Sequence, residues 1–307
     1  MAKSLVPPDG GYGWAIVLGA GLTQCFSGPT MAMYGLLFGS KFDQFGSSPT
    51  ERNSVFATFL VTWCVMSLFA GPLIQMRSSR FVAFCATLLN VVGLVIIALS
   101  TSTELMFLGY GLVMGAGMGL NNPNNIIIMS KYFKKRLGSA YGLYATGLTV
   151  FQLALPQLVT FLLNNFSDQT TIFIYTILTS VGFIGALLMK PVDAYLVIEL
   201  DCEADLRQVE PLVTGNKKAS IVSVNNEAKE KIEDKSRNYF AFLKIFTMIN
   251  WKLLQDPYFI AIAVGNSFVF NSVLSYMSQY VAIATEKGLE GDESANLISF
   301  ASATEIV

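Results

Sequence analysis

Six long apolar runs fill the first part of the chain, and each has the length needed to cross a membrane. They cover about residues 14–38, 55–75, 81–99, 105–129, 137–163 and 171–189. A membrane-spanning helix needs about 20 mostly apolar residues. Because lipid offers the backbone no hydrogen-bonding partner, a chain that crosses it repeatedly must form helices or a closed barrel. Runs of this length predict an all-α polytopic membrane protein.

The composition excludes several other classes of protein. Of 307 residues, 53% are hydrophobic and only 13% are charged, which is too few charges to solvate an ordinary globular surface. A net charge of −1 argues against a nucleic-acid partner. The four cysteines stand singly and there is no histidine, so no metal site, cofactor or catalytic nucleophile is expected. The sequence therefore does not indicate an enzyme.

Charge divides the chain into four predicted segments. Residues 1–13 form an N-terminal segment, 14–189 a six-helix transmembrane bundle, 190–256 a central loop of mixed charge, and 257–307 the start of a second bundle with two helices. Short loops rich in Lys and Arg stay in the cytoplasm. The N-terminus and the central loop are therefore predicted to be cytoplasmic.

The distribution of all Lys and Arg residues between the two predicted sides tests this orientation. Only Lys41, Arg52 and Lys287 fall on the predicted outer side, and every other Lys and Arg falls inside. This asymmetry is the one that the orientation rule expects.

A short glycine-rich motif stands immediately before the first apolar run. Its glycines allow a tight entry into the bilayer, its acid can cap a helix N-terminus, and its aromatic side chains suit the membrane interface. Both an interfacial cap and a binding role remain open for it. The motif consists of Asp9, Gly10, Gly11, Tyr12, Gly13 and Trp14.

A cationic motif separates the fourth and fifth runs and predicts a cytoplasmic hairpin. It consists of Tyr132, Phe133, Lys134, Lys135 and Arg136. Together, D-G-G-Y-G-W and Y-F-K-K-R resemble, in the same order, the two signatures of the monocarboxylate transporter family within the major facilitator superfamily. Two signatures in their proper order are more specific than either one alone.

The resemblance implies a function and a setting. Such proteins are secondary active transporters, including symporters, that move monocarboxylates or related small organic solutes through the plasma membrane by alternating access. Some members need a single-span immunoglobulin-type glycoprotein as an ancillary partner. The lysine of proton-coupled lactate carriers falls on Ala32 here, which argues against proton-coupled lactate transport.

The resemblance also implies that the chain is a C-terminally truncated member, because the family has twelve spans. The transport function would then be incomplete in this chain. The alternative is a non-transporting truncated isoform that acts as a membrane interaction or regulatory subunit.

Two sets of polar residues inside apolar runs are candidates for substrate contact or coupling. Amides cluster around Pro123, where they either hydrogen-bond to neighbouring helices or line an aqueous cavity. Glu305 would lie about 18 Å along the eighth run if that run begins near residue 294. It matches an acid of the family, and it either works in the membrane or simply faces water at the chain end. The amides are Asn121, Asn122, Asn124 and Asn125.

Glycines and a proline predict two further features. Ser27-Gly28-Pro29 should break the first span, because proline lacks the backbone N–H that a helix uses. Gly111, Gly115 and Gly119 recur every four residues and should allow close approach to a neighbouring helix.

Overall fold

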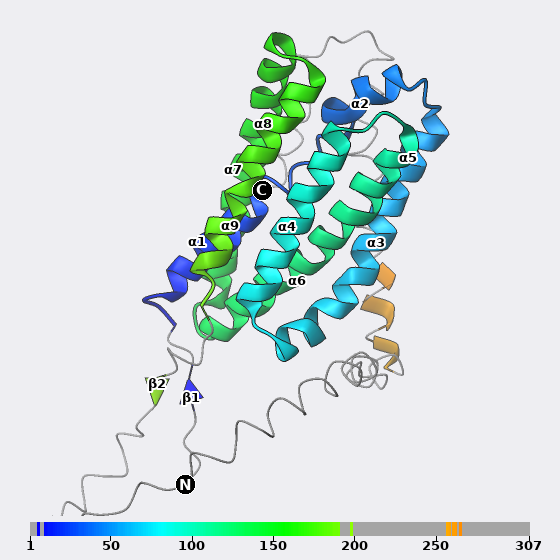
Figure 1. Ribbon diagram of the computed structural model, residues 1–307. Coiled ribbons are helices and arrows are strands. Elements are labelled where there is room, and N and C mark those ends of the chain that lie inside the picture. Colours follow the sequence, from blue (N-terminus) through cyan, green and yellow to red (C-terminus); the bar gives the residue numbers. More distant parts are fainter. Residues whose placement is uncertain are drawn as a thin grey trace, which may run out of the picture. The chain divides into compact units, whose positions relative to one another are not determined.

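The computed structural model describes residues 5–6, 9–190, 197–198, 256–258, 260–262 and 264–265 (Figure 1). Residues 9–190 belong to one compact unit, and the strand residues belong to another. Strands β1 (Leu5–Val6) and β2 (Val197–Ile198) are antiparallel, with Leu5 opposite Ile198. This short strand pair is absent from the all-α prediction.

The long helices confirm the predicted fold class of an all-α membrane protein. Within the described residues, five helical stretches are long and apolar enough to cross a membrane, namely Pro49–Met76, Ser79–Ala98, Thr103–Tyr132, Leu137–Asn165 and Asp168–Leu188. The helices of the unit are α1 Gly13–Gln24, α2 Tyr34–Gln44, α3 Pro49–Met76, α4 Ser79–Ala98, α5 Thr103–Met106, the π-helix η1 Phe107–Met114, α6 Gly115–Tyr132, α7 Leu137–Asn165, α8 Asp168–Ser180 and α9 Gly182–Leu188.

The first predicted span is broken, as Ser27-Gly28-Pro29 predicted. Helix α1 ends at Gln24 and α2 begins at Tyr34. Their 12 and 11 residues reach about 16–18 Å each, less than the roughly 30 Å thickness of a hydrocarbon core. Among the described residues, five of the six predicted runs are therefore helices of spanning length, and the first run is divided into two shorter helices.

Local capping moves one predicted boundary. Helix α3 begins at Pro49, six residues before the predicted start, because Ser48 and Glu51 form a capping box. The Glu51 N–H donates to Ser48 Oγ (3.3 Å), and the Ser48 N–H donates to Glu51 Oε2 (2.8 Å). The polar start of this helix was predicted to be loop.

The glycine stripe lies against α3, as its spacing predicted. A Cβ atom placed on Gly119 would lie 2.6 Å from the Trp63 carbonyl oxygen, and one on Gly115 would lie 2.9 Å from that of Phe59. A Cβ on Gly111 would lie 3.0 Å from Thr58 Cγ2. Only glycine permits this approach of η1 and α6 to α3.

The spans differ in how much of their surface the unit buries. In the most apolar window of each span, 22% of the residues of α3 and 28% of those of α7 are buried, against 44–56% in the other three. Helix α6, by contrast, contacts α1, α3, α4 and α7. Helices α3 and α7 thus present the largest apolar surfaces, while α6 lies at the centre of the packing.

Candidate functional site

The two sequence motifs meet in space at one end of the bundle. Asp9 Oδ1 accepts hydrogen bonds from the backbone N–H groups of Lys134 (2.6 Å), Lys135 (2.9 Å) and Arg136 (3.3 Å). The Asp9 N–H in turn donates to the Tyr132 carbonyl oxygen (3.2 Å). We call the contact between residues 9–14 and 132–136 the signature clamp.

The chain around Asp9 turns sharply to make this contact. Asp9 has φ = 43° and Gly11 has φ = 55°, so both lie in the left-handed region, which glycine adopts freely. The Gly10 carbonyl oxygen accepts the Gly13 N–H (3.0 Å). Asp9 caps the turn before α7, whereas the N-cap residue of its own helix, Tyr12, makes no side-chain capping bond.

The electrostatics of the clamp favour the ionised form of Asp9. The backbone N–H of Lys134 is the main reason that the Asp9 pKa lies below its ordinary value of 3.8; desolvation opposes this, and the N–H groups of Arg136 and Lys135 add to it. The carboxylate also lies just before the N-terminus of α7, where the helix dipole favours a negative charge.

Aromatic rings close the clamp above this hydrogen-bonded layer. The ring centroids of Trp14 and Phe133 are 5.1 Å apart, and Phe133 is 1% exposed. A Cβ atom on Gly13 would lie 2.8 Å from Phe133 Cζ, so a larger residue there would displace the ring. The third glycine of the motif thus makes room for the second motif.

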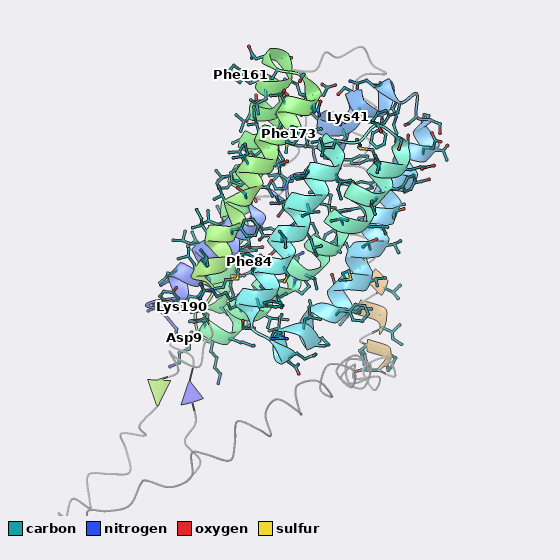
Figure 2. All side chains as sticks on the ribbon, in the orientation of Figure 1. Asp9, Lys41, Phe84, Phe161, Phe173 and Lys190 are labelled. Carbon is teal, nitrogen blue, oxygen red and sulfur yellow. The ribbon has the colours of Figure 1, made fainter. Side chains whose placement is uncertain are left out.

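The same end of the bundle includes the end of α9. The Tyr12 hydroxyl donates to the Leu188 carbonyl oxygen (2.9 Å), and the Tyr132 hydroxyl donates to that of Lys190 (3.0 Å). Lys190 Nζ lies 4.9 Å from the centroid of the Tyr12 ring. Figure 2 shows Asp9 and Lys190 at this end and Lys41 at the opposite end.

Three of the four predicted amides hold helices together. Asn121 Nδ2 donates to the Thr23 carbonyl oxygen (2.9 Å) and to Gln24 Oε1 (2.8 Å) at the end of α1. Asn125 Nδ2 approaches Thr23 Oγ1 (3.2 Å) and Tyr144 of α7 (3.4 Å).

Asn124 faces the other side of α6. Its Nδ2 donates to the Ser79 carbonyl oxygen of α4 (3.1 Å). Asn121, Asn124 and Asn125 are all 0% exposed. Of the two alternatives for the amides, hydrogen bonding between helices therefore holds for these three.

Asn122 lies in a different environment. It is half-buried and lines an open cleft of about 390 Å³ between α3 and α6. The cleft is lined by Trp63, Cys64, Ser67, Asn122, Pro123 and Ile126.

Lys41 is a buried cation that the sequence pattern did not single out. It is 5% exposed, and its Nζ donates to the carbonyl oxygens of Ile97 (2.7 Å) and Ala98 (2.8 Å), where α4 ends. Burial lowers the pKa of Lys41, and the charge of Asp168 opposes this shift. Its basic side chain in the last turn of α2 was the available signal, but its partners are more than fifty positions away.

Other predicted features lie beyond these contacts. Glu305 lies outside the described residues, as do nearly all of the central loop and most of the second bundle. Within the residues that the structure describes, no group of three or more His, Cys, Asp or Glu side chains could hold a metal ion.

Comparison with known proteins identifies a family and several relatives that this chain resembles in sequence. A family model described as the Major Facilitator Superfamily matches residues 20–306. Monocarboxylate transporter 10 of Mus musculus is 29% identical over 192 residues, which cover 61% of this chain and 37% of that protein. Monocarboxylate transporter 4 of Gallus gallus is 31% identical over 155 residues, or 49% of this chain and 32% of that protein. These relatives confirm the resemblance that the two motifs predicted.

A solved structure is similar in fold. The crystal structure of a POT family transporter in complex with 5-aminolevulinic acid covers 90% of this chain and 54% of its own, with a TM-score of 0.50 and 15% identity. The chain spans about a third of the length of the curated relatives it matches.

Proposed function

This chain belongs to the major facilitator superfamily, and from that premise we propose that it moves a small organic solute across a membrane by alternating access. The family match over residues 20–306 carries the proposal. In such transporters the substrate site lies near the bilayer midplane, between two halves of the molecule. On this proposal, residues 14–189 are the first half, 190–256 the cytoplasmic loop and 257–307 the start of the second half.

The substrate class follows from the relatives and from one position in the sequence. Relatives named monocarboxylate transporters support a monocarboxylate or a related small organic solute. Ala32, where proton-coupled lactate carriers have a lysine, argues against proton-coupled lactate symport. We place the protein in the plasma membrane with its N-terminus in the cytoplasm. Co-expression with a single-span immunoglobulin-type glycoprotein would test whether the protein needs such a partner to reach the cell surface.

Uptake in oocytes tests the proposal. Radiolabelled lactate, aromatic amino acids and creatine-like solutes would be offered to cells that express this chain or a version extended to twelve spans, at two external pH values. We expect the extended version to take up at least one solute, without a strong dependence on pH for lactate-sized anions.

The remaining outcomes are equally informative. Surface expression of both versions without uptake of any solute would contradict transport. Uptake by the 307-residue chain itself would show that copies complete the site together. Inhibition of the extended version by the shorter one would favour a regulatory role.

A further inference from the structure

The cleft between α3 and α6 lies at the depth where a transported solute would bind. Trp63 is about 20 Å along α3 from either end, and Asn122 is about 15 Å from the end of α6 at Tyr132. The hydrocarbon core of a bilayer is about 30 Å thick. The cleft therefore opens close to the middle of the membrane.

The cleft begins where the glycine stripe ends. At Gly119 the backbones of α3 and α6 are in close contact, since a Cβ there would lie 2.6 Å from the Trp63 carbonyl oxygen. One turn further along α6, Asn122 and Pro123 line the open volume instead. Pro123 also has no N–H to donate to the carbonyl of Gly119.

The cleft faces away from the helices that pack behind α6. Asn122 and Asn124 are two positions apart, which places them about 200° apart around the helix. Because Asn124 reaches the Ser79 carbonyl oxygen of α4, Asn122 points to the side opposite α4. That side adjoins α3, the span whose apolar window is the least buried of the five.

The lining defines the chemistry of a ligand. None of the six lining residues carries a formal charge, so a carboxylate would have no ionic partner among them. Asn122 offers both a donor and an acceptor, and the structure gives it no hydrogen bond among the described residues. The Ser67 hydroxyl donates to the Trp63 carbonyl oxygen (2.8 Å), which leaves it as an acceptor. Trp63 supplies an aromatic wall.

We propose that the α3–α6 cleft binds the uncharged, aromatic or amide-bearing part of the transported solute, through the ring of Trp63 and the amide of Asn122. The inference rests on the proposed transport function and assigns a ligand class to its midplane site. A charged end of the solute would point away from this cleft.

Cys64 provides a reporter inside the cleft, because it is exposed and free. Only the thiolate reacts quickly, and it forms in water and not in lipid. The chain in proteoliposomes would be treated with a charged methanethiosulfonate reagent, and mass spectrometry would follow modification of the Cys64 peptide. Benzamide would be the uncharged aromatic probe and lactate the aliphatic carboxylate.

We expect Cys64 to be modified, benzamide to slow the reaction at least threefold, and lactate to leave its rate unchanged. Asn122→Ala should abolish this protection, judged against the rate of the same variant in the absence of probe, and Trp63→Phe should retain part of it. Asn165→Ala, which removes an exposed amide outside the cleft, should keep full protection.

Two results would overturn the inference: a Cys64 that the charged reagent does not reach, or protection that survives Asn122→Ala unchanged. Uptake by the version extended to twelve spans, measured in vesicles in which its Cys64 is also labelled, separates this inference from the proposed function. Transport without protection of Cys64 would contradict ligand binding in the cleft and leave the transport proposal standing. Protection without transport would contradict the transport proposal and leave ligand binding in the cleft standing.

Discussion

Asp9 and Lys41 are charged side chains that backbone groups hold at opposite ends of the bundle (Figure 2). Asp9 accepts three backbone N–H groups before α7, and Lys41 donates to carbonyl oxygens where α4 ends. Each charge has the sign that the nearby helix terminus favours, negative at an N-terminus and positive at a C-terminus. Both residues join elements that are distant in the sequence.

The clamp gives the stability of the protein a specific pH dependence. Because its folded-state pKa is depressed, Asp9 stabilises the protein above its ordinary value of 3.8, and this contribution is lost as the pH falls through the lower folded-state value. We expect Asp9→Asn to lower the melting temperature in detergent by a constant amount at pH 5–8. The difference from wild type should shrink below pH 3.8. An equal difference at pH 3 and pH 7 would contradict the ionised clamp.

Removal of the Lys41 ammonium takes away the donor to the Ala98 carbonyl oxygen, whereas the Ile97 carbonyl oxygen keeps the Ser100 hydroxyl (2.7 Å). We expect Lys41→Met, which keeps the length of the side chain, to reduce the free energy of unfolding by about 1–3 kcal/mol. Lys131→Met is the matched control, since Lys131 is exposed, and it should change this free energy by less than about 0.5 kcal/mol. Denaturant titration in detergent micelles measures both, and equal effects would show that the contacts of Lys41 contribute nothing.

At the scale of elements, the positions of proline and glycine predicted the helix break and a helix contact, whereas the polar residues of α6 did not predict their partners. The break after α1 and the contact of the glycine stripe with α3 both follow from local chemistry, Pro29 in one case and a four-residue repeat in the other. The amides of α6 left two alternatives, because a helical wheel gives the direction of each side chain but not the neighbour it meets. The sequence alone could not predict that Asp9 caps the 134–136 turn, because this contact depends on how distant spans assemble.

The amides of α6 should separate into structural and exposed members. Asn125→Leu removes bonds to α1 and α7, and such bonds between membrane helices contribute about 0.6 kcal/mol on average and up to about 1.7 kcal/mol. Asn122→Leu breaks no hydrogen bond to any residue that the structure describes, and its effect on the free energy of unfolding should stay within about 0.5 kcal/mol. Unfolding in bicelles compares the two variants, and a larger loss for Asn122→Leu would reverse their assignment.

Glycines in two spans offer a second matched pair. Gly119→Ala should destabilise the bundle by about 1–3 kcal/mol, because the new methyl group meets backbone atoms of α3. Apart from the neighbouring backbone of its own helix, no described atom lies within 4 Å of a Cβ placed on Gly142 of α7. Gly142→Ala should therefore stabilise the helix by up to about 1 kcal/mol. Unfolding in bicelles measures both variants. Equal changes in the free energy of unfolding would contradict the close contact of Gly119 with α3.

For the whole molecule, we expect the clamp and Lys41 to lie on opposite sides of the membrane. The orientation rule places the cationic residues 131–136 in the cytoplasm. In a background in which all four native cysteines are replaced by serine, we expect an impermeant thiol reagent to label Thr50→Cys in intact cells and Lys135→Cys only after permeabilisation. The reverse pattern would invert the topology, and labelling of both positions in intact cells would rule out a membrane between them.

The clamp also sets an order for biosynthesis. Asp9 and Lys134, which donates the shortest hydrogen bond to the Asp9 carboxylate, are 125 positions apart. At translation rates of about 5–20 residues per second, the N-terminal segment waits roughly 6–25 s for that partner to be made. During this interval helices α1 to α6 are synthesised before Asp9 can make its contacts with residues 134–136. Closure of the clamp is therefore a late event that records whether the hairpin before α7 has reached the same side of the membrane as the N-terminus.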